Sequence, residues 1–105
     1  MGLRVKEFTL ATDRTRVSVG EPFEVELTCA WTPITEGGDE TVRIFCENGD
    51  FGATPSGVSV HVEPLGGMTT KTFSVILQGP GGELVNVVAQ APSGSQDTIV
   101  LQVAP

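Results

Sequence analysis

The sequence predicts an all-β domain, built as a two-sheet antiparallel sandwich of about seven strands. Valine and threonine are abundant, and these branched residues favour a pleated, half-buried surface. Short segments of alternating apolar and polar residues recur along the whole chain, divided by 13 glycines and 7 prolines. No segment keeps a helical period over ten residues, and 105 residues suit a single domain. Short, regularly spaced strands in a chain of this length are typical of a sandwich.

The clearest alternation covers residues 23–31, where every second residue is apolar and most intervening residues are acidic or polar. The turn signals Gly37-Gly38, Asn48-Gly49 and Gly79-Pro80 separate other segments of the same kind. Seven principal strands and one short piece, 17–19, are therefore expected. In order, the principal strands are 4–10, 23–31, 41–47, 57–63, 69–78, 83–91 and 96–103.

The period of two also assigns one face of each strand to the interior. The apolar residues on these faces form the predicted core. They include Phe23, Val25, Leu27, Trp31, Ile44, Val60, Phe73, Val75, Val87 and Leu101.

The net charge of −7 excludes two classes of partner. Four of the six basic residues lie in the first 16 positions, so the rest of the chain is strongly acidic and repels nucleic acid and anionic lipid. No stretch approaches the ~20 apolar residues of a membrane span, so no membrane insertion is expected. The N-terminus lacks the apolar core of a signal peptide, so a secreted protein would carry its signal elsewhere.

Cys29 and Cys46 both fall on the inward face and are the candidates for a disulfide. A two-residue hairpin turn at Gly37-Gly38 would pair them directly, at a non-hydrogen-bonded site where side chains approach closely. In a regular sandwich the two strands would instead lie in opposite sheets, and the bridge would cross the core. The alternative is a pair of buried free thiols.

Nothing in the sequence indicates an enzyme. The single histidine, His61, lies on the polar face of its strand, and no nucleophile, phosphate-loop or metal-site motif accompanies it. Trp31 ends an inward run and is assigned to the core. Phe45, outward by parity, and Phe51, in a loop, are the candidates for an exposed apolar contact.

Two segments resemble the immunoglobulin-like repeats of bacterial and archaeal surface proteins. Residues 19–25 (Val-Gly-Glu-Pro-Phe-Glu-Val) are similar to the entry into the second strand of such repeats, and residues 97–103 to their last strand. The layout is similar to CARDB-like and fibronectin-III-like domains, although the chain has no tyrosine and so no tyrosine corner. The resemblance implies an immunoglobulin-like sandwich, excised from a larger multidomain protein.

The resemblance also implies a function and a location. It predicts a non-catalytic structural, adhesive or protein-interaction module, at the cell surface or secreted. The partners would be neighbouring domains of the same chain and an unknown protein or glycan. The alternative function is an accessory carbohydrate- or calcium-binding module of a secreted enzyme.

The loops offer one candidate cation site. Sandwich order places the loops around 33–40, 64–68 and 92–97 at one end. Hard cations take six or more oxygen ligands, so acidic side chains gathered there would suit calcium; no other cofactor or metal is expected. The candidate residues are Glu36, Asp39, Glu40 and Asp97.

Overall fold

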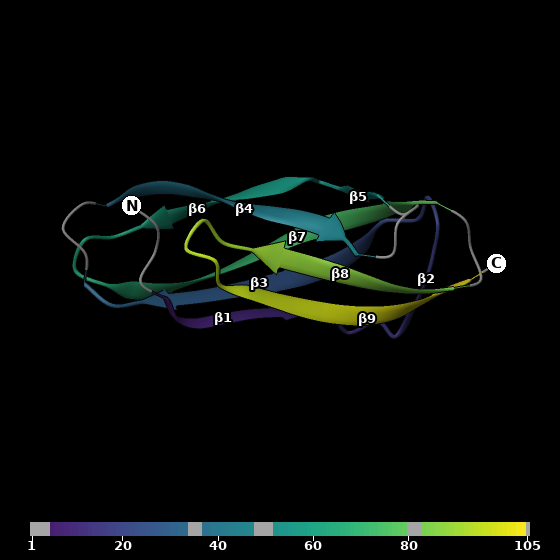
Figure 1. The fold of residues 1–105 in the computed structure, drawn as a ribbon, viewed down its shortest axis with the longest axis horizontal. Coiled ribbons are helices and arrows are strands. Elements are labelled where there is room, and N and C mark those ends of the chain that lie inside the picture. Colours follow the sequence, from purple (N-terminus) through teal and green to yellow (C-terminus); the bar gives the residue numbers. More distant parts are fainter. Residues whose placement is uncertain (1–4, 34–36, 48–51, 80–82, 105) are drawn as a thin grey trace.

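The computed structural model describes residues 5–33, 37–47, 52–79 and 83–104 and contains nine strands and no helix in these ranges. The predicted all-β sandwich is confirmed (Figure 1), with nine strands in place of about seven. Within the described residues, no helix has the length and apolar character needed to cross a membrane. The strands are β1 (Val5–Ala11), β2 (Arg16–Ser18), β3 (Phe23–Trp31), β4 (Gly38–Cys46), β5 (Gly52–Thr54), β6 (Gly57–Val62), β7 (Gly67–Gln78), β8 (Leu84–Gln90) and β9 (Gln96–Ala104).

The strands form a four-stranded sheet, β1-β3-β7-β5, and a five-stranded sheet, β2-β9-β8-β4-β6. Every pairing is antiparallel except that of β2 with β9, which is parallel. The chain therefore leaves the first sheet after β1 and joins the second at β2. This crossing explains why the alternation is broken between residues 11 and 16.

β5 lies in a segment that was expected to be a loop, and that expectation was wrong. It has three residues and no apolar alternation of its own. It exists as a strand because Gly52, Ala53 and Thr54 pair with the end of β7. β4 also begins at Gly38, three residues before the predicted start, because its first residues pair with β6.

The core lies between the two sheets. Nine of the ten predicted core residues are at most 4% exposed, whereas Phe73 is only half-buried. Phe73 lies on a stretch of β7 that forms the edge of its sheet, because β5 pairs only with residues 76–78. Its side chain therefore packs against the core from the open side of the sandwich.

Along each open side, a hydrogen bond between described residues links the two sheets. On the β1/β9 side, the backbone N–H of Leu10 donates to the Asp97 carboxylate at 2.8 Å. On the β6/β7 side, Lys71 has the inward parity of β7, and its ammonium donates to the backbone oxygen of Ser59 at 2.9 Å. Both contacts occupy edge groups that another strand could otherwise pair with.

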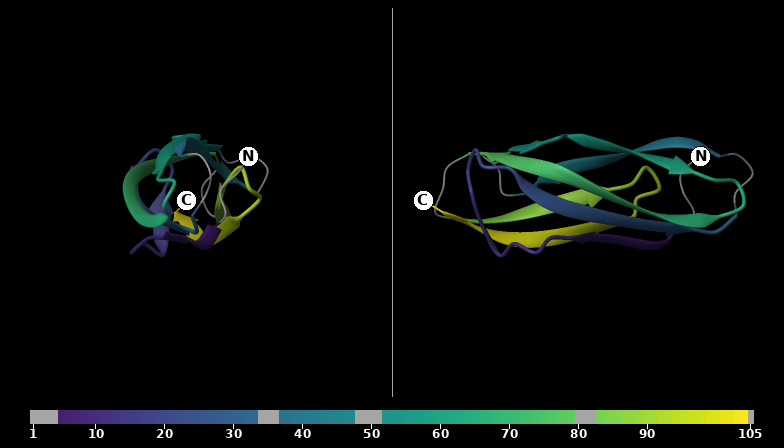
Figure 2. Two further views of the ribbon diagram at one scale, coloured as in Figure 1. Left: turned by 90° about the vertical axis from the view of Figure 1, so that its left-hand side faces the viewer. Right: turned by 180° about the vertical axis from the view of Figure 1, so that it is seen from behind.

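The domain is elongated, with extents of 48 × 23 × 17 Å. β1 begins beside Trp31, at the end where β3 finishes, and β9 finishes beside Ser18 at the other end. The two terminal strands therefore lead away from opposite ends of the long axis (Figures 1 and 2).

Candidate functional site

The described members of the predicted acidic cluster, Asp39, Glu40 and Asp97, are not brought together. Asp97 lies level with Ile44 through the pairings of β8, and Asp39 lies five residues farther along β4. At about 3.3 Å per residue, this separates Asp39 from Asp97 by roughly 17 Å along the strands. Glu40 lies on the opposite face of β4 from Asp39, and Glu36 lies outside the described residues.

Asp97 lies far from Asp39 because the β8–β9 hairpin is short. Its last pair, Gln90 with Gln96, lies level with Arg43, so the turn stops well short of the end that β4 and β6 reach. The Asp97 carboxylate instead accepts the hydrogen bond from β1. In the part of the chain that is described, no three His, Cys, Asp or Glu side chains are grouped so that they could hold a metal ion.

Asp39 lies beside the single histidine at the edge of the five-stranded sheet. His61 Nδ1 is 2.9 Å from Asp39 Oδ1, and Nε2 is 3.0 Å from Glu63 Oε1. All three side chains are more than 60% exposed. A carboxylate only accepts hydrogen bonds, so both contacts are satisfied together when the imidazole is protonated on both nitrogens. In that doubly protonated form, His61 has no lone pair available as a general base.

The hydrogen bond to Asp39 raises the pKa of His61 above its ordinary value of 6.5, and the charge of Glu63 adds to this effect. A group whose pKa is higher in the folded state holds its proton more tightly there. It therefore stabilises the fold below pH 6.5, and this contribution disappears as the pH rises through the folded pKa.

We expect an NMR titration of the His61 ring to give a pKa above 6.5, and the Asp39→Asn variant to bring it back toward that value. The free energy of unfolding of the wild type should fall over the same pH range, a change that His61→Gln removes. A His61 pKa at or below 6.5 in the folded protein would contradict this assignment.

The structure does not contain the predicted bridge: Cys29 and Cys46 are both free thiols. Cys29 lies on β3, which pairs with β1 and β7, and Cys46 lies on β4, which pairs with β6 and β8. The hairpin pairing of β3 with β4 was therefore wrong, and the arrangement in opposite sheets is the observed one.

The cysteines also lie at different levels along the sandwich. The Asp97 carboxylate bonds the β1 residue that pairs with Leu27, so Asp97 and Leu27 are level. From this common level, Cys29 lies two residues toward the end of the sandwich where β3 finishes. Cys46 is level with Ile99, which lies two residues from Asp97 toward the opposite end. Four residues correspond to roughly 13 Å. This exceeds the ~7 Å between Cα atoms that a disulfide can span.

Burial raises the pKa of the Cys29 thiol to about 11 and raises that of Cys46. We expect a thiol reagent at neutral pH to leave Cys29 unmodified in the folded protein, because the reactive thiolate is scarce and enclosed. In denaturant without reductant, the same reagent should titrate two thiols per chain. A value below two would reveal a disulfide.

A hollow of about 390 Å³ lies on the outer face of the five-stranded sheet. Arg43 and Gln90 face each other across β4 and β8 at its base. The Arg43 guanidinium carbon lies 5.1 Å from the ring centre of Phe45, which is half-buried on the same face, as its parity predicted. Phe51 lies outside the described residues. The residues that line the hollow are Thr41, Arg43, Gln90, Ala91, Pro92 and Gly94.

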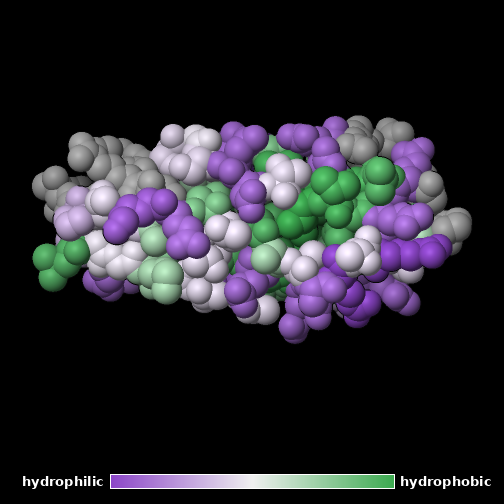
Figure 3. All heavy atoms as spheres, turned by 90° about the horizontal axis from the view of Figure 1, so that it is seen from below, coloured by the Kyte–Doolittle hydropathy of each residue, from purple (hydrophilic) through white to green (hydrophobic). Residues whose placement is uncertain are grey.

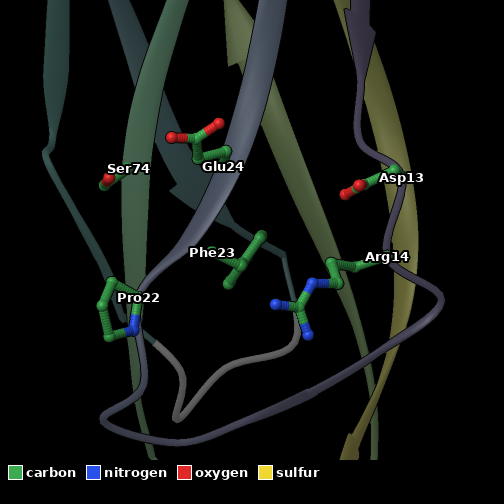
Figure 4. Close-up of a pocket in the computed structure, with 6 residues that line it drawn as sticks. All are labelled: Asp13, Arg14, Pro22, Phe23, Glu24 and Ser74. Atoms are coloured by element: carbon green, nitrogen blue, oxygen red, sulfur yellow. The ribbon is translucent and has the colours of Figure 1, made fainter.

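A second hollow, of about 350 Å³, lies where the chain crosses between the sheets. Asp13 and Arg14 extend from the β1–β2 connection toward β3, where Pro22 and Glu24 flank the buried Phe23 (Figure 4). Its two carboxylates are too few for a hard cation, which takes six to eight oxygen ligands.

None of the exposed large apolar side chains among the described residues lines either of these two hollows. Seen from the side of β1 and β9, apolar atoms cover a continuous area bordered by hydrophilic atoms (Figure 3). The exposed large apolar residues of β8 and β9 are Leu84 and Val100, and those of the β6–β7 end are Leu65 and Met68.

Comparison with solved structures identifies the fold. The CARDB domain of a Pyrococcus furiosus protein, solved in complex with di-metal ions, superposes with a TM-score of 0.62 and 13% identity. The match covers 99% of this chain and 98% of that one. This chain has a CARDB-like, immunoglobulin-like fold. At this identity the likeness concerns the CARDB-like fold alone.

The CARDB-like sandwich also matches part of a β-glucosidase from Listeria innocua, solved in complex with glucose, with a TM-score of 0.63 and 19% identity. That match covers 94% of this chain but only 16% of the enzyme chain. No family model and no curated protein sequence matches the chain.

Sequence reasoning found Phe45 but missed the hollow beside it. The signal present was Arg43, two residues before Phe45 on the same face of a strand. What completes the hollow is the pairing of Arg43 with Gln90, 47 positions away, and the turn that follows Gln90.

Proposed function

We propose that this domain is a non-catalytic structural module, which spaces neighbouring domains of a surface or secreted protein. The observation that carries the proposal is the position of the terminal strands. β1 starts at one end of a 48 Å long sandwich and β9 finishes at the other. Neighbours attached at the two ends would be held apart by the length of the domain.

The pairing of the terminal strands suits a module that carries tension. A pull on the two ends draws β1 along β3, and β2 along β9, in opposite directions. The β2–β9 pair comprises Arg16 with Gln102, Val17 with Val103, and Ser18 with Ala104. Because the two strands of each pair are pulled past each other along their length, the bonds between them are loaded together and not one after another.

The side chains that could perform chemistry are engaged or enclosed, which supports a non-catalytic role. Both ring nitrogens of His61 contact carboxylates. Burial raises the pKa values of both cysteines, which disfavours their thiolates. The CARDB-like fold is consistent with this reading.

Single-molecule pulling tests the load-bearing role. Handles at the two chain ends should require a higher unfolding force than handles at Glu83 and the C-terminus, which are adjacent at the open end of the β8–β9 hairpin, because the second arrangement peels that hairpin open one pair at a time. The Val17→Pro variant removes a backbone N–H and disturbs the strand geometry of β2. It should lower the unfolding force measured between the chain ends and leave the force for peeling the hairpin nearly unchanged. Equal forces in the two geometries would overturn the proposal.

A further inference from the structure

The hollow beside Arg43 has the features of a binding site. At about 390 Å³ it falls within the range of ligand pockets. It lies over β4 and β8, two inner strands of the five-stranded sheet, so its base is a rigid part of the fold. Arg43 and Gln90 are direct neighbours there, and Thr41 follows on the same face of β4.

Arg43 is held in place without being neutralised. Its guanidinium lies over the Phe45 ring at 5.1 Å, a cation–π contact that orients the planar group. Among the described residues, no carboxylate oxygen lies within 4.0 Å of it, although the chain carries a net charge of −7. Its N–H donors therefore remain available to a ligand.

The β8–β9 turn forms a fixed wall of the hollow. The Ala91 N–H donates to the oxygen of Ser95 at 2.7 Å, and the Gly94 N–H donates to the oxygen of Ala91 at 2.9 Å. Gly94 has a φ of 96°, a conformation that favours glycine. Ala91 is buried, and the wall presents the exposed Pro92, which offers apolar surface next to the polar base.

We propose that this hollow binds a sugar that carries a carboxylate, such as a uronic acid unit of a glycan. The guanidinium fork matches a carboxylate bidentately, the Gln90 amide and Thr41 hydroxyl suit sugar hydroxyls, and the Pro92 wall suits the apolar face of a pyranose ring. This site goes beyond the spacing function and does not depend on it.

The position of the hollow favours a sugar over an acidic peptide. An extended peptide gains affinity by pairing with an open strand edge, but Arg43 is paired with Gly57 of β6 on one side and with Gln90 of β8 on the other. Asp39 and Glu63 lie on the neighbouring edge of the same sheet and would repel a densely charged chain. A single carboxylate among hydroxyls fits these constraints best.

NMR titration of the whole domain tests the site, with methyl glucuronide as the probe and its uncharged methyl ester as the matched ligand. We expect saturable shifts at Arg43 and Gln90 with the acid, and at least about tenfold weaker binding of the ester. Arg43→Gln should weaken the binding of the acid by a similar factor. Arg14→Gln, which removes the same charge elsewhere, should bind it as the wild type does.

A second variant keeps the test decisive if Arg43→Gln fails to fold. Gln90→Glu places a carboxylate opposite Arg43 and should block the acid by occupying the guanidinium. Equal binding of acid and ester, unchanged binding by Gln90→Glu, or no saturable shift would overturn the proposal. Tighter binding of a short aspartate peptide at the same residues would overturn the sugar assignment in favour of a protein partner. None of these outcomes affects the pulling experiment.

Discussion

Replacing Trp31 by alanine is expected to lower the free energy of unfolding by about 3–5 kcal/mol, the range for removing a large aromatic side chain from a core. Trp31 is 4% exposed and is the last residue of β3, at the end of the sandwich. Its ring lies 3.6 Å from the position that a Cβ would occupy on Gly67. The alanine variant would leave a cavity beneath the β6–β7 turn.

The indole nitrogen makes a second contribution. Trp31 Nε1 donates to the backbone oxygen of Glu63 at 2.9 Å, which also accepts the Gly66 N–H of the turn at 3.1 Å. Trp31→Phe keeps most of the apolar contact and removes this hydrogen bond. We expect it to lose about 1 kcal/mol from the bond, plus a smaller packing term.

Urea unfolding of the wild type and the two variants measures these differences. Leu65→Ala is the control, because Leu65 is 89% exposed on the same turn and its removal should change stability by less than about 0.5 kcal/mol. If Trp31→Ala were no less stable than Leu65→Ala, the assignment of Trp31 to the core would be wrong.

The second large effect is expected at Gly37, which precedes β4. A Cβ there would lie 2.5 Å from the backbone oxygen of Val62 and 2.7 Å from Cδ of Pro64. The oxygen belongs to β6, which is paired with Gly38 at this point, so it cannot move without disturbing the β4–β6 pairing. We expect Gly37→Ala to lose about 3 kcal/mol, at the upper end for overpacked sites.

Gly52→Ala is the matched control for Gly37→Ala. The nearest atom to a Cβ at Gly52 is Oε1 of Gln78 at 3.8 Å, an ordinary contact, and its φ is not positive. Alanine there should be neutral or stabilise the domain by up to about 1 kcal/mol, because it restricts the unfolded chain. Equal thermal midpoints for the two variants would show that the close approach at Gly37 is relieved without cost.

The candidate sites show where prediction from the sequence stops. Burial of Trp31 and the outward orientation of His61 and Phe45 were correctly predicted, because each depends on the parity of one strand. The contacts of His61 with Asp39 and Glu63 were not foreseen. Asp39 reaches His61 only because β4 pairs with β6 in the observed register, a fact that no local pattern contains.

Sequence alone determined that this protein is an all-β sandwich and which face of each main strand is buried. Those properties follow from a period of two, which is a local property of the chain. Only the tertiary structure decided which strands are neighbours. It placed β3 and β4 in opposite sheets, offset so that Cys29 and Cys46 lie at different levels, and it formed β5 by pairing with β7.

The level of each strand along the sandwich was likewise a tertiary property. It keeps Asp97 away from Asp39 and brings Arg43 to Gln90. The alternation of a strand does not depend on which strand lies beside it. It is also unchanged when the two strands are offset by any even number of residues. Neighbour and offset depend instead on the packing of residues far apart in the chain, and the sites of this protein depend on both.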